Sequence, residues 1–496
     1  MRLLTILSLL ITPLLANAPS LPDNSSLSSS DASYDGNALV LTGRVVLDHG
    51  LGKMTAEEAS LQRQESNKDF PFSSIQLRKD VLLALKNSAQ ISCGSADLDF
   101  HSLKGTLLPS ENGKVIYTDQ IKKKKGGDSI ALNLSGQLIE LNFSKQSHDG
   151  EKTEYGVQNI LAKEDVVINY ADSFYLTAHQ ALYCKELSED NTTSKKELQG
   201  VITAYPKDEL SKCHLFHLGD EILADMIDLD LINSKISLLH PKGTLAAAIL
   251  PHLQTAEMHF QADHLYWDQN KNILTLKGNI AIDEASLGIL NAHEELQIFQ
   301  TVIKGKHVLK GIHVQGPSTL VYKDAHNHSH KLVSHGSMNL DRDKLRAKIE
   351  SPEKEGIVSS EHQLYYEEEE LAIFADHASL EYLVVNNVMQ PESLTLKGNI
   401  RLFSHDQTQP LKCGAADRLT YSLTTRTLIL SANPGKKVLF WDEAQGVHLS
   451  APEVHITYDS ATKEQNVKGI GAVQFTFTSE EQSKLQQLFP QFKGPL

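Results

Sequence analysis

A short histidine-rich segment is the strongest candidate for metal chemistry in this 496-residue sequence. It reads His326-Asn-His328-Ser-His330, and His335 follows it. Alternate residues of a β-strand share one face, so histidines at this spacing could chelate a transition metal. The Asn, Ser and Asp residues around them indicate an exposed loop instead. We therefore expect no metal site and no cofactor.

Residues for other chemistry are equally sparse. The acidic run Glu367–Glu370 lacks the graded oxygen ligands and the glycine of a calcium loop, and is typical of a solvated hairpin tip. The sequence contains no G-x-S-x-G, H-E-x-x-H or phosphate-binding loop motif. Paired carboxylates for sugar hydrolysis need not be close in sequence, but nothing points to such a pair. The sequence therefore predicts a protein that is not an enzyme.

Four cysteines are present, at Cys93, Cys184, Cys213 and Cys413. No C-x-x-C pair occurs, so neither zinc binding nor thiol exchange is indicated. In an oxidising compartment disulfides are allowed, and the pair nearest in sequence is Cys184 with Cys213. Four buried free thiols are the alternative.

The N-terminus has the three parts of a secretory signal peptide. Arg2 is basic, Leu3–Leu15 is mostly apolar, and Ala16-Asn17-Ala18 resembles a cleavage site. We expect residues 1–18 to be removed and the mature chain to lie in the periplasm. Residues 19–33 are rich in Ser, Asn and Asp and predict a disordered leader. The alternative for residues 1–18 is an amphipathic or buried first strand.

The net charge of -15 argues against nucleic acid and against adsorption to an anionic membrane, since both require basic surfaces. No segment after the signal peptide offers about 18 consecutive apolar residues, so no transmembrane span is expected in the mature chain.

The elements around these residues are short strands, several of which repeat. Leu41–Leu47, Leu276–Ile282 and Leu396–Leu402 all read L-x-G-[NR]-[IV]-x-[IL]. Apolar residues alternate strictly with polar ones, and the glycine falls on the apolar face, where it indicates a bulge, a bend or a close approach. This period of two predicts an all-β fold of antiparallel strands. The alternation predicts these inward-facing residues: Leu41, Val45, Leu47, Leu274, Leu276, Ile280, Ile282, Leu396, Ile400, Leu402, Leu419 and Tyr421.

A second repeated element pairs a small residue with Asp or a similar polar residue, as in Ala262-Asp263 and Ala375-Asp376. Such a pair suits a tight bend between strands. The repeating unit is therefore a strand with Gly-Asn, a turn, and a strand entered through Ala-Asp. Stacking such units builds a one-dimensional β assembly.

These two elements resemble the OstA-like repeats of lipopolysaccharide-transport proteins, also called LptA-like. The resemblance covers residues 34–64, 258–300 and 371–458. It implies one or more elongated β-jellyroll (β-taco) modules that hold lipopolysaccharide acyl chains in an apolar groove and serve outer-membrane assembly. It also implies edge-strand stacking with other lipopolysaccharide-transport proteins. We expect jellyroll regions at 34–250 and 258–478 and a terminal helix or tail at 479–496, with a short helix around Leu215–Ile227.

Two other functions fit parts of the sequence. A groove and a filled core share the same alternation, so a secreted structural or adhesive β-solenoid with a filled core is the main alternative. A polysaccharide-processing enzyme on a β-helix would need clustered acidic or basic residues on one exposed face. The polar faces here carry scattered Lys, Asn, Thr and Arg instead.

Overall fold

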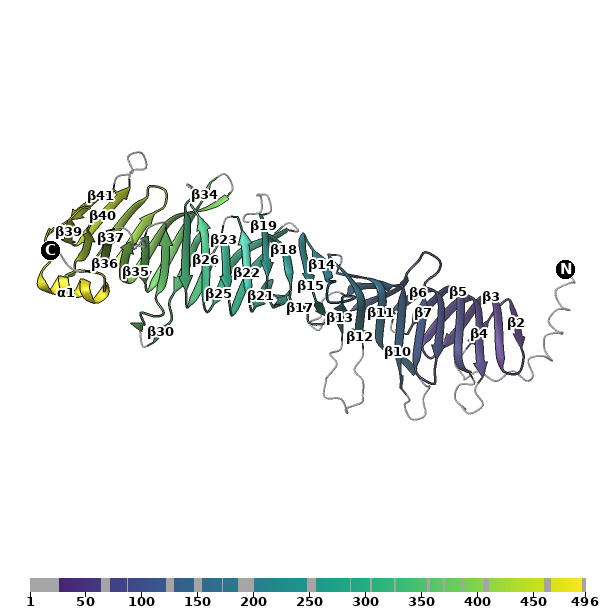
Figure 1. Ribbon diagram of the computed structural model, residues 1–496. Coiled ribbons are helices and arrows are strands. Elements are labelled where there is room, and N and C mark those ends of the chain that lie inside the picture. The colour runs from purple at the N-terminus through teal and green to yellow at the C-terminus, as the bar shows by residue number, and fades with distance from the viewer. Residues whose placement is uncertain are drawn as a thin grey trace. The chain divides into compact units, whose positions relative to one another are not determined.

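A computed structural model describes these residues: 26–63, 72–86, 88–121, 129–146, 154–171, 173–185, 200–247, 256–285, 287–303, 306–324, 327–354, 357–368, 371–385, 388–404, 410–458 and 465–492. Most of them lie in antiparallel strands, so the predicted all-β class is confirmed (Figure 1). The predicted signal peptide and the basic run at residues 122–127 lie outside the described residues.

The chain divides into two compact units. Unit 1 comprises residues Met1–His217 and Leu223–Leu238, and unit 2 comprises Leu218–Ile222 and Leu239–Leu496. β15 (Asp220–Ala224) and β17 (Lys235–Leu239) carry residues of both.

Unit 1 contains these further strands: β1 (Ser26–Ser28), β2 (Asp31–Tyr34), β3 (Ala38–His49), β4 (Gly52–Arg63), β5 (Phe72–Leu85), β6 (Gln90–Asp99), β7 (Lys104–Leu108), β8 (Val115–Ile121), β9 (Ile130–Gly136), β10 (Leu138–Gln146), β11 (Glu154–Tyr170), β12 (Phe174–Cys184), β13 (Val201–Tyr205), β14 (Cys213–His217) and β16 (Met226–Asp230).

Unit 2 contains the remaining elements: β18 (Lys242–Ala247), β19 (Ala256–Gln261), β20 (His264–Asp268), β21 (Ile273–Lys277), β22 (Ile280–Glu284), β23 (Gly288–Ala292), β24 (Glu295–Ile303), β25 (Lys306–Gln315), β26 (Ser318–Lys323), β27 (Ser329–Ser334), β28 (Ser337–Asp341), β29 (Arg346–Glu350), β30 (Glu353–Lys354), β31 (Ile357–Val358), β32 (Leu364–Glu368), β33 (Leu371–Ala375), β34 (His377–Val385), β35 (Val388–Ser404), β36 (Lys412–Ser422), β37 (Thr427–Ser431), β38 (Val438–Asp442), β39 (Val447–Ala451), β40 (Glu453–Tyr458), β41 (Gln465–Ile470) and α1 (Ser479–Leu488).

The strands of unit 2 form two walls. Wall A runs in pairing order β20, β21, β24, β25, β28, β29, β34, the first part of β35, the second part of β36, β37, β40 and β41. Wall B runs β18, β19, β22, β23, β26, β27, β32, β33, the second part of β35, the first part of β36, β38 and β39. β35 and β36 therefore pass from one wall into the other.

The walls meet at a corner built from the two repeated sequence elements. Gly398 and Asn399 both have positive φ, at 77° and 45°, and the register of β35 shifts between Lys397 and Ile400. Two successive left-handed residues turn the strand out of one wall and into the other. Gly278 and Asn279 repeat this geometry, with φ of 69° and 42°.

The first described residues contradict part of the predicted disordered leader. Ser26–Ser28 and Asp31–Tyr34 pair with β3, at Ser26↔Asp48 and Asp31↔Thr42. Both short strands have largely exposed side chains. An exposed edge strand carries the same polar composition as a disordered segment, so composition alone could not distinguish them.

The predicted helix around Leu215–Ile227 is also wrong. The segment forms β14, β15 and β16, with alternating burial along each. Leu218 and Gly219 have positive φ and break the chain between β14 and β15, which the apolar spacing alone did not reveal.

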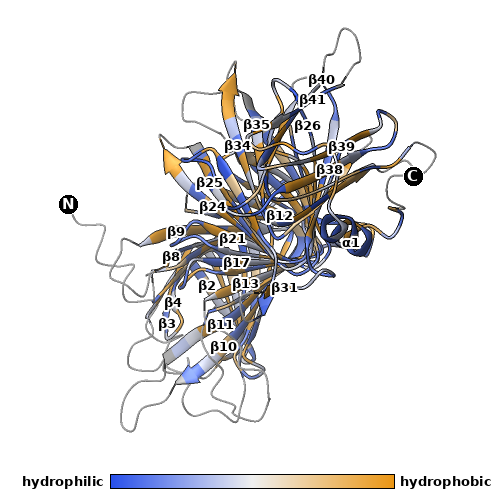
Figure 2. Cartoon of the chain, turned by 90° about the vertical axis from the view of Figure 1, so that its left-hand side faces the viewer, coloured by the Kyte–Doolittle hydropathy of each residue, from blue (hydrophilic) through white to orange (hydrophobic). Residues whose placement is uncertain are grey.

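Helix α1 lies within the range for which the sequence predicts a terminal helix. Thr478 caps it, accepting from the Glu481 N–H, while Glu481 accepts from the Thr478 N–H. Most of its residues are polar, so the helix is largely blue in Figure 2, and Leu485 is its buried residue. This side packs on Cys413, Ala415, Leu439 and Trp441 of wall B, together with Phe477, Phe489 and Phe492.

Candidate functional site

All twelve residues predicted to face inward are buried. Their exposed fractions run from 0% to 6%, and Tyr421 is the most exposed of them. Nine lie in unit 2, where strand register pairs Leu396 with Leu419, and Ile280 with the buried Ala292, which was not predicted. Leu41, Val45 and Leu47 lie on β3 in unit 1.

Wall B carries a row of cross-strand neighbours on its inner face. Ile282 pairs with Leu290, and the row continues strand by strand to Leu402. Every member of this row is buried. The members are Ile282, Leu290, Leu320, Leu332, Tyr366, Ile373 and Leu402.

Wall A carries the matching row. Leu274 pairs with Ile298, and the row continues to Tyr421 with every member buried. The members are Leu274, Ile298, Ile312, Leu340, Ala347, Leu380, Leu394 and Tyr421. The sequence motifs identified the ends of both rows. The strands between them lack Gly-Asn, although their alternation could have identified them.

Each wall has one end at the corner and one end away from it. We call the ends away from the corner the mouth, and there polar side chains replace the apolar ones. Ile280 is next to the corner and Glu284 is four residues further along β22. At about 3.3 Å per residue, the buried layer between the walls extends roughly 13 Å along the strand there.

Three side-chain pairs lie at the mouth of unit 2, and we call them the mouth pairs. Two of them join wall A to wall B, and the third joins wall A to β15, which pairs with β18 of wall B. Asp220 Oδ2 lies 3.1 Å from His307 Nδ1, and Glu284 Oε2 lies 3.5 Å from Arg342 Nη2. Tyr421 donates a hydrogen bond of 2.8 Å to Glu368 Oε1. These acidic side chains are buried, so none of the pairs is a loose surface contact.

Glu368 is the centre of a larger buried network. The Tyr366 hydroxyl lies 3.3 Å from Glu368 Oε2 and 2.7 Å from His330 Nδ1, and Arg426 lies 3.8 Å from Glu368 Oε1. Burial raises the pKa of Tyr366 well above its ordinary value, with neighbouring Tyr322 and Glu368 adding to the effect. Tyr366 therefore keeps its proton and can donate. The expectation that Glu368 belongs to a solvated hairpin tip is wrong, because it points into this network.

Arg342 is also a buried charged residue that an oppositely charged neighbour stabilises. Burial lowers the pKa of its guanidinium, while the charge of Glu284 and the neighbouring Tyr382 oppose that effect. A buried cation of this kind is retained only when a counter-charge lies beside it.

Unit 1 contains a comparable polar pair. Lys185 Nζ, just after β12, lies 2.5 Å from Asp119 Oδ2 on β8 and donates to the Tyr117 hydroxyl at 2.9 Å. The Asp119 side chain is 4% exposed and that of Lys185 is 13% exposed. The same chemistry thus recurs in both units.

The histidine-rich segment does not form an exposed loop throughout. His330 is on β27 and fully buried, and both it and His328 face Asp324, at 3.6 Å and 3.1 Å. His326 lies outside the described residues. In the ranges given above, no group of three or more His, Cys, Asp or Glu side chains could hold a metal ion.

No disulfide joins Cys184 to Cys213, or any other pair of the four cysteines. Burial raises the pKa of the Cys93, Cys213 and Cys413 thiols to about 12, so these behave as small apolar core residues.

Fold and site together define an antiparallel β protein with buried apolar rows between two walls and a polar mouth. No protein-family model matches the sequence. No characterised protein matches it in sequence. Among the described residues, no helix combines the length and hydropathy that crossing a bilayer requires.

Two solved structures show faint similarity. One is LptH, the periplasmic LptA homologue of the lipopolysaccharide transport device of Pseudomonas aeruginosa. It is 9% identical, over 36% of this chain and 94% of LptH, with a TM-score of 0.15. The other is an extracellular domain of a one-component system from B. thetaiotaomicron, 8% identical over 90% of this chain and 80% of that domain, with a TM-score of 0.10. At these TM-scores neither structure defines the fold or the function of this chain.

Proposed function

We propose that this protein is a periplasmic, non-catalytic lipid carrier that shields the acyl chains of lipopolysaccharide between wall A and wall B. One observation carries the proposal: two apolar rows face the space between the walls, and that space ends in a charged mouth. A lipid with apolar chains and an anionic, sugar-bearing head matches this arrangement, because it is apolar along its chains and charged at its head.

Energetics favour such a site for a lipid in water. Each buried CH₂ group contributes about 0.8 kcal/mol, so several acyl chains need complete shielding to leave a membrane. Because the inner residues are already buried, chains can enter only if the walls move apart. The mouth pairs would then separate, and their charged groups could contact the lipid head instead. The free energy of lipid binding must therefore offset the cost of separating wall A from wall B.

The sequence resemblance to OstA-like repeats supports the same proposal. Its Gly-Asn and Ala-Asp elements form the corner that sets the two walls at an angle. The signal-peptide pattern supports export, and β1 and β2 provide short exposed strands beside β3 to which other lipopolysaccharide-transport proteins could add a strand.

A filled-core structural β protein is the second candidate. Near-complete burial of residues such as Leu276 and Leu396, both 0% exposed, favours it. Lipid content separates the two candidates, since a filled core carries no lipid.

Mass spectrometry of lipids extracted from the full-length protein, purified from its native envelope, tests the proposal. We expect lipopolysaccharide to co-purify, and to be lost from Ile282→Asp, which places charge on the inner row. Ala281→Asp is the matched control, because the neighbouring residue faces the other side of β22 and should leave lipid binding intact. Circular dichroism confirms that both variants fold. Absence of lipid from the unmodified protein would exclude the carrier function.

A further inference from the structure

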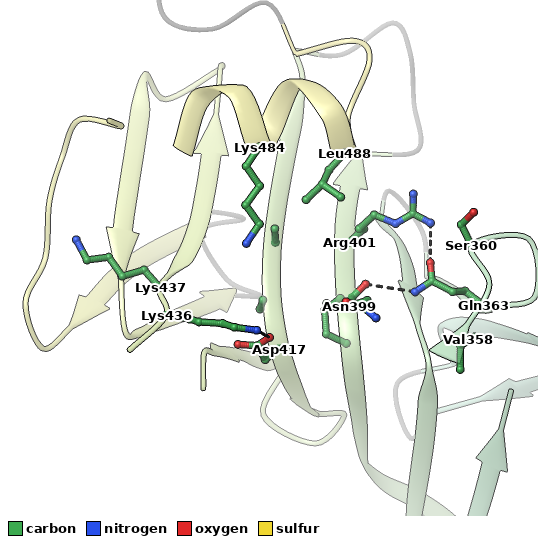
Figure 3. A pocket seen from close by; sticks show the side chains of 13 residues that line it. Val358, Ser360, Gln363, Asn399, Arg401, Asp417, Lys436, Lys437, Lys484 and Leu488 are labelled. Carbon is green, nitrogen blue, oxygen red and sulfur yellow. Dashed lines mark hydrogen bonds and ion pairs between the residues drawn. The ribbon is translucent and has the colours of Figure 1, made fainter. Parts of the chain in front are cut away.

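A pocket of about 290 Å³ lies in unit 2 between the corner residue Asn399 and helix α1 (Figure 3). We propose that this pocket binds an oxyanion, a phosphate or carboxylate group on a small polar ligand. The inference does not depend on lipid between the walls. The cationic side chains that line the pocket are Arg401, Lys436, Lys437 and Lys484.

Positive charge dominates this pocket in an otherwise acidic chain. Four cations line it, and Asp417 is the one carboxylate among the described lining residues. Lys436 Nζ lies 3.3 Å from Asp417 Oδ1 and largely offsets that charge. Among the lining residues, cations therefore outnumber carboxylates by four to one, in a chain whose net charge is -15. Such a local reversal of sign attracts small anions.

The polar partners of two of these cations are neutral. Arg401 donates to Gln363 Oε1 at 2.7 Å, and Lys437 donates to Gln474 Oε1 at 2.5 Å. Amide oxygens orient both cations, while the charge of Asp376 acts on Arg401 and that of Glu481 acts on Lys437. The nearby carboxylate of Asp376 is buried and accepts hydrogen bonds from Asn399 and Gln363.

The pocket is held in place before any ligand arrives. The Arg401 guanidinium lies over the Phe374 ring at 4.8 Å, which fixes the plane of its donors. Helix α1 carries Lys484, and the packing of Leu485 and Phe489 anchors that helix. Figure 3 shows Lys484 reaching from α1 toward the strands that carry Asp417 and Asn399. Pre-positioned charged donors favour bidentate binding of phosphate or carboxylate.

The volume limits the ligand class. About 290 Å³ is at the lower end of small-molecule sites, so it suits an anion with one sugar-sized group and excludes a whole lipid. The anionic group could come from free phosphate or from a phosphorylated sugar of a lipid head.

Isothermal titration of the full-length protein at low salt distinguishes these sources, with inorganic phosphate and glucosamine 1-phosphate as separate probes. Saturable binding is expected for phosphate, and tighter binding of glucosamine 1-phosphate would assign the site to a sugar head group. Equal affinities would assign it to the free anion. The double variant Lys436→Gln with Lys484→Gln should weaken binding about tenfold or more.

Two comparisons make the test specific to the pocket. Lys310→Gln with Lys348→Gln removes the same charge from exposed positions that do not line the pocket, and should leave affinity nearly unchanged. Asp417→Asn should strengthen phosphate binding, because it removes the like charge. Absence of saturable binding, or equal weakening by both double variants, overturns the proposal.

Discussion

Asn399 donates a hydrogen bond of 2.8 Å from Nδ2 to Oδ2 of Asp376, and so joins the two sequence repeats at the corner between the walls. Asn279 makes the same bond to Asp263 at 2.9 Å. The Gly-Asn element and the Ala-Asp element are therefore two halves of one corner. The Asp376 carboxylate occupies the space that a Cβ at Gly398 would need, and the Asp263 carboxylate does the same at Gly278.

Replacing a corner glycine should destabilise unit 2 strongly. A Cβ at Gly398 would lie 2.3 Å from Asp376 Oδ2, and φ there is 77°. Left-handed strain and overlap together should cost Gly398→Ala about 2–5 kcal/mol, measured by urea unfolding of the full-length protein. Gly435→Ala is the control, since Gly435 has φ of 83° but open space around it. It should cost about 1–2 kcal/mol. Equal losses would show that the carboxylate contact is unimportant.

Breaking a mouth pair on one side should be costly. Arg342→Met leaves Glu284 buried without its counter-charge, and should lower the free energy of unfolding by about 3–5 kcal/mol. Adding Glu284→Gln should recover much of that loss, because the uncompensated charge is then gone. Hydrogen exchange in β22 and β28 reports the local effect.

An exposed ion pair provides the comparison for that experiment. Lys344 lies 2.6 Å from Asp341, and its side chain is 74% exposed. Lys344→Met should therefore change stability by about 1 kcal/mol or less. A loss from Arg342→Met no larger than this would mean that the mouth pair does not hold the walls together.

Much of the strand structure of unit 2 could be predicted from the alternation of apolar and polar residues alone. The alternation around Leu276 and Leu396 gave the inner face correctly, and the glycines beside them marked a bend. The partners across the walls could not be predicted, because Glu284 and Arg342 are 58 positions apart and each resembles an ordinary surface charge. The burial of Glu368 could not be predicted either, because it stands in an acidic run and so resembles an ordinary surface charge.

Stability of unit 1 should fall as the solution is acidified below neutral pH. His49 is buried, and this burial, with a smaller effect of Lys86, lowers its pKa from 6.5 to about 4. The unfolded chain therefore binds a proton at higher pH than the folded chain does. The neutral His49 side chain contributes fully to the free energy of unfolding above pH 6.5. This contribution, roughly 3 kcal/mol, is lost progressively as pH falls toward 4.

Urea unfolding between pH 4 and 7, comparing the unmodified protein with His49→Gln, checks this prediction. The imidazole accepts from the Leu51 N–H at 3.2 Å and stacks on the Tyr155 ring, with 5.2 Å between the ring centroids. The amide of the variant preserves a polar acceptor there. The variant should show a shallower pH dependence in this window. Identical slopes would mean that His49 titrates normally in the folded protein.

Contact between lipid and the inner row is the central claim, and site-specific photo-crosslinking in the native envelope tests it most directly. A photoreactive residue at Leu320 lies on the buried row of wall B, and one at the adjacent Val321 faces the opposite side of the same strand. We predict a crosslink to lipopolysaccharide from position 320 and none from position 321. Labelling from both positions alike, or from neither in a folded protein, would contradict a lipid held between the walls.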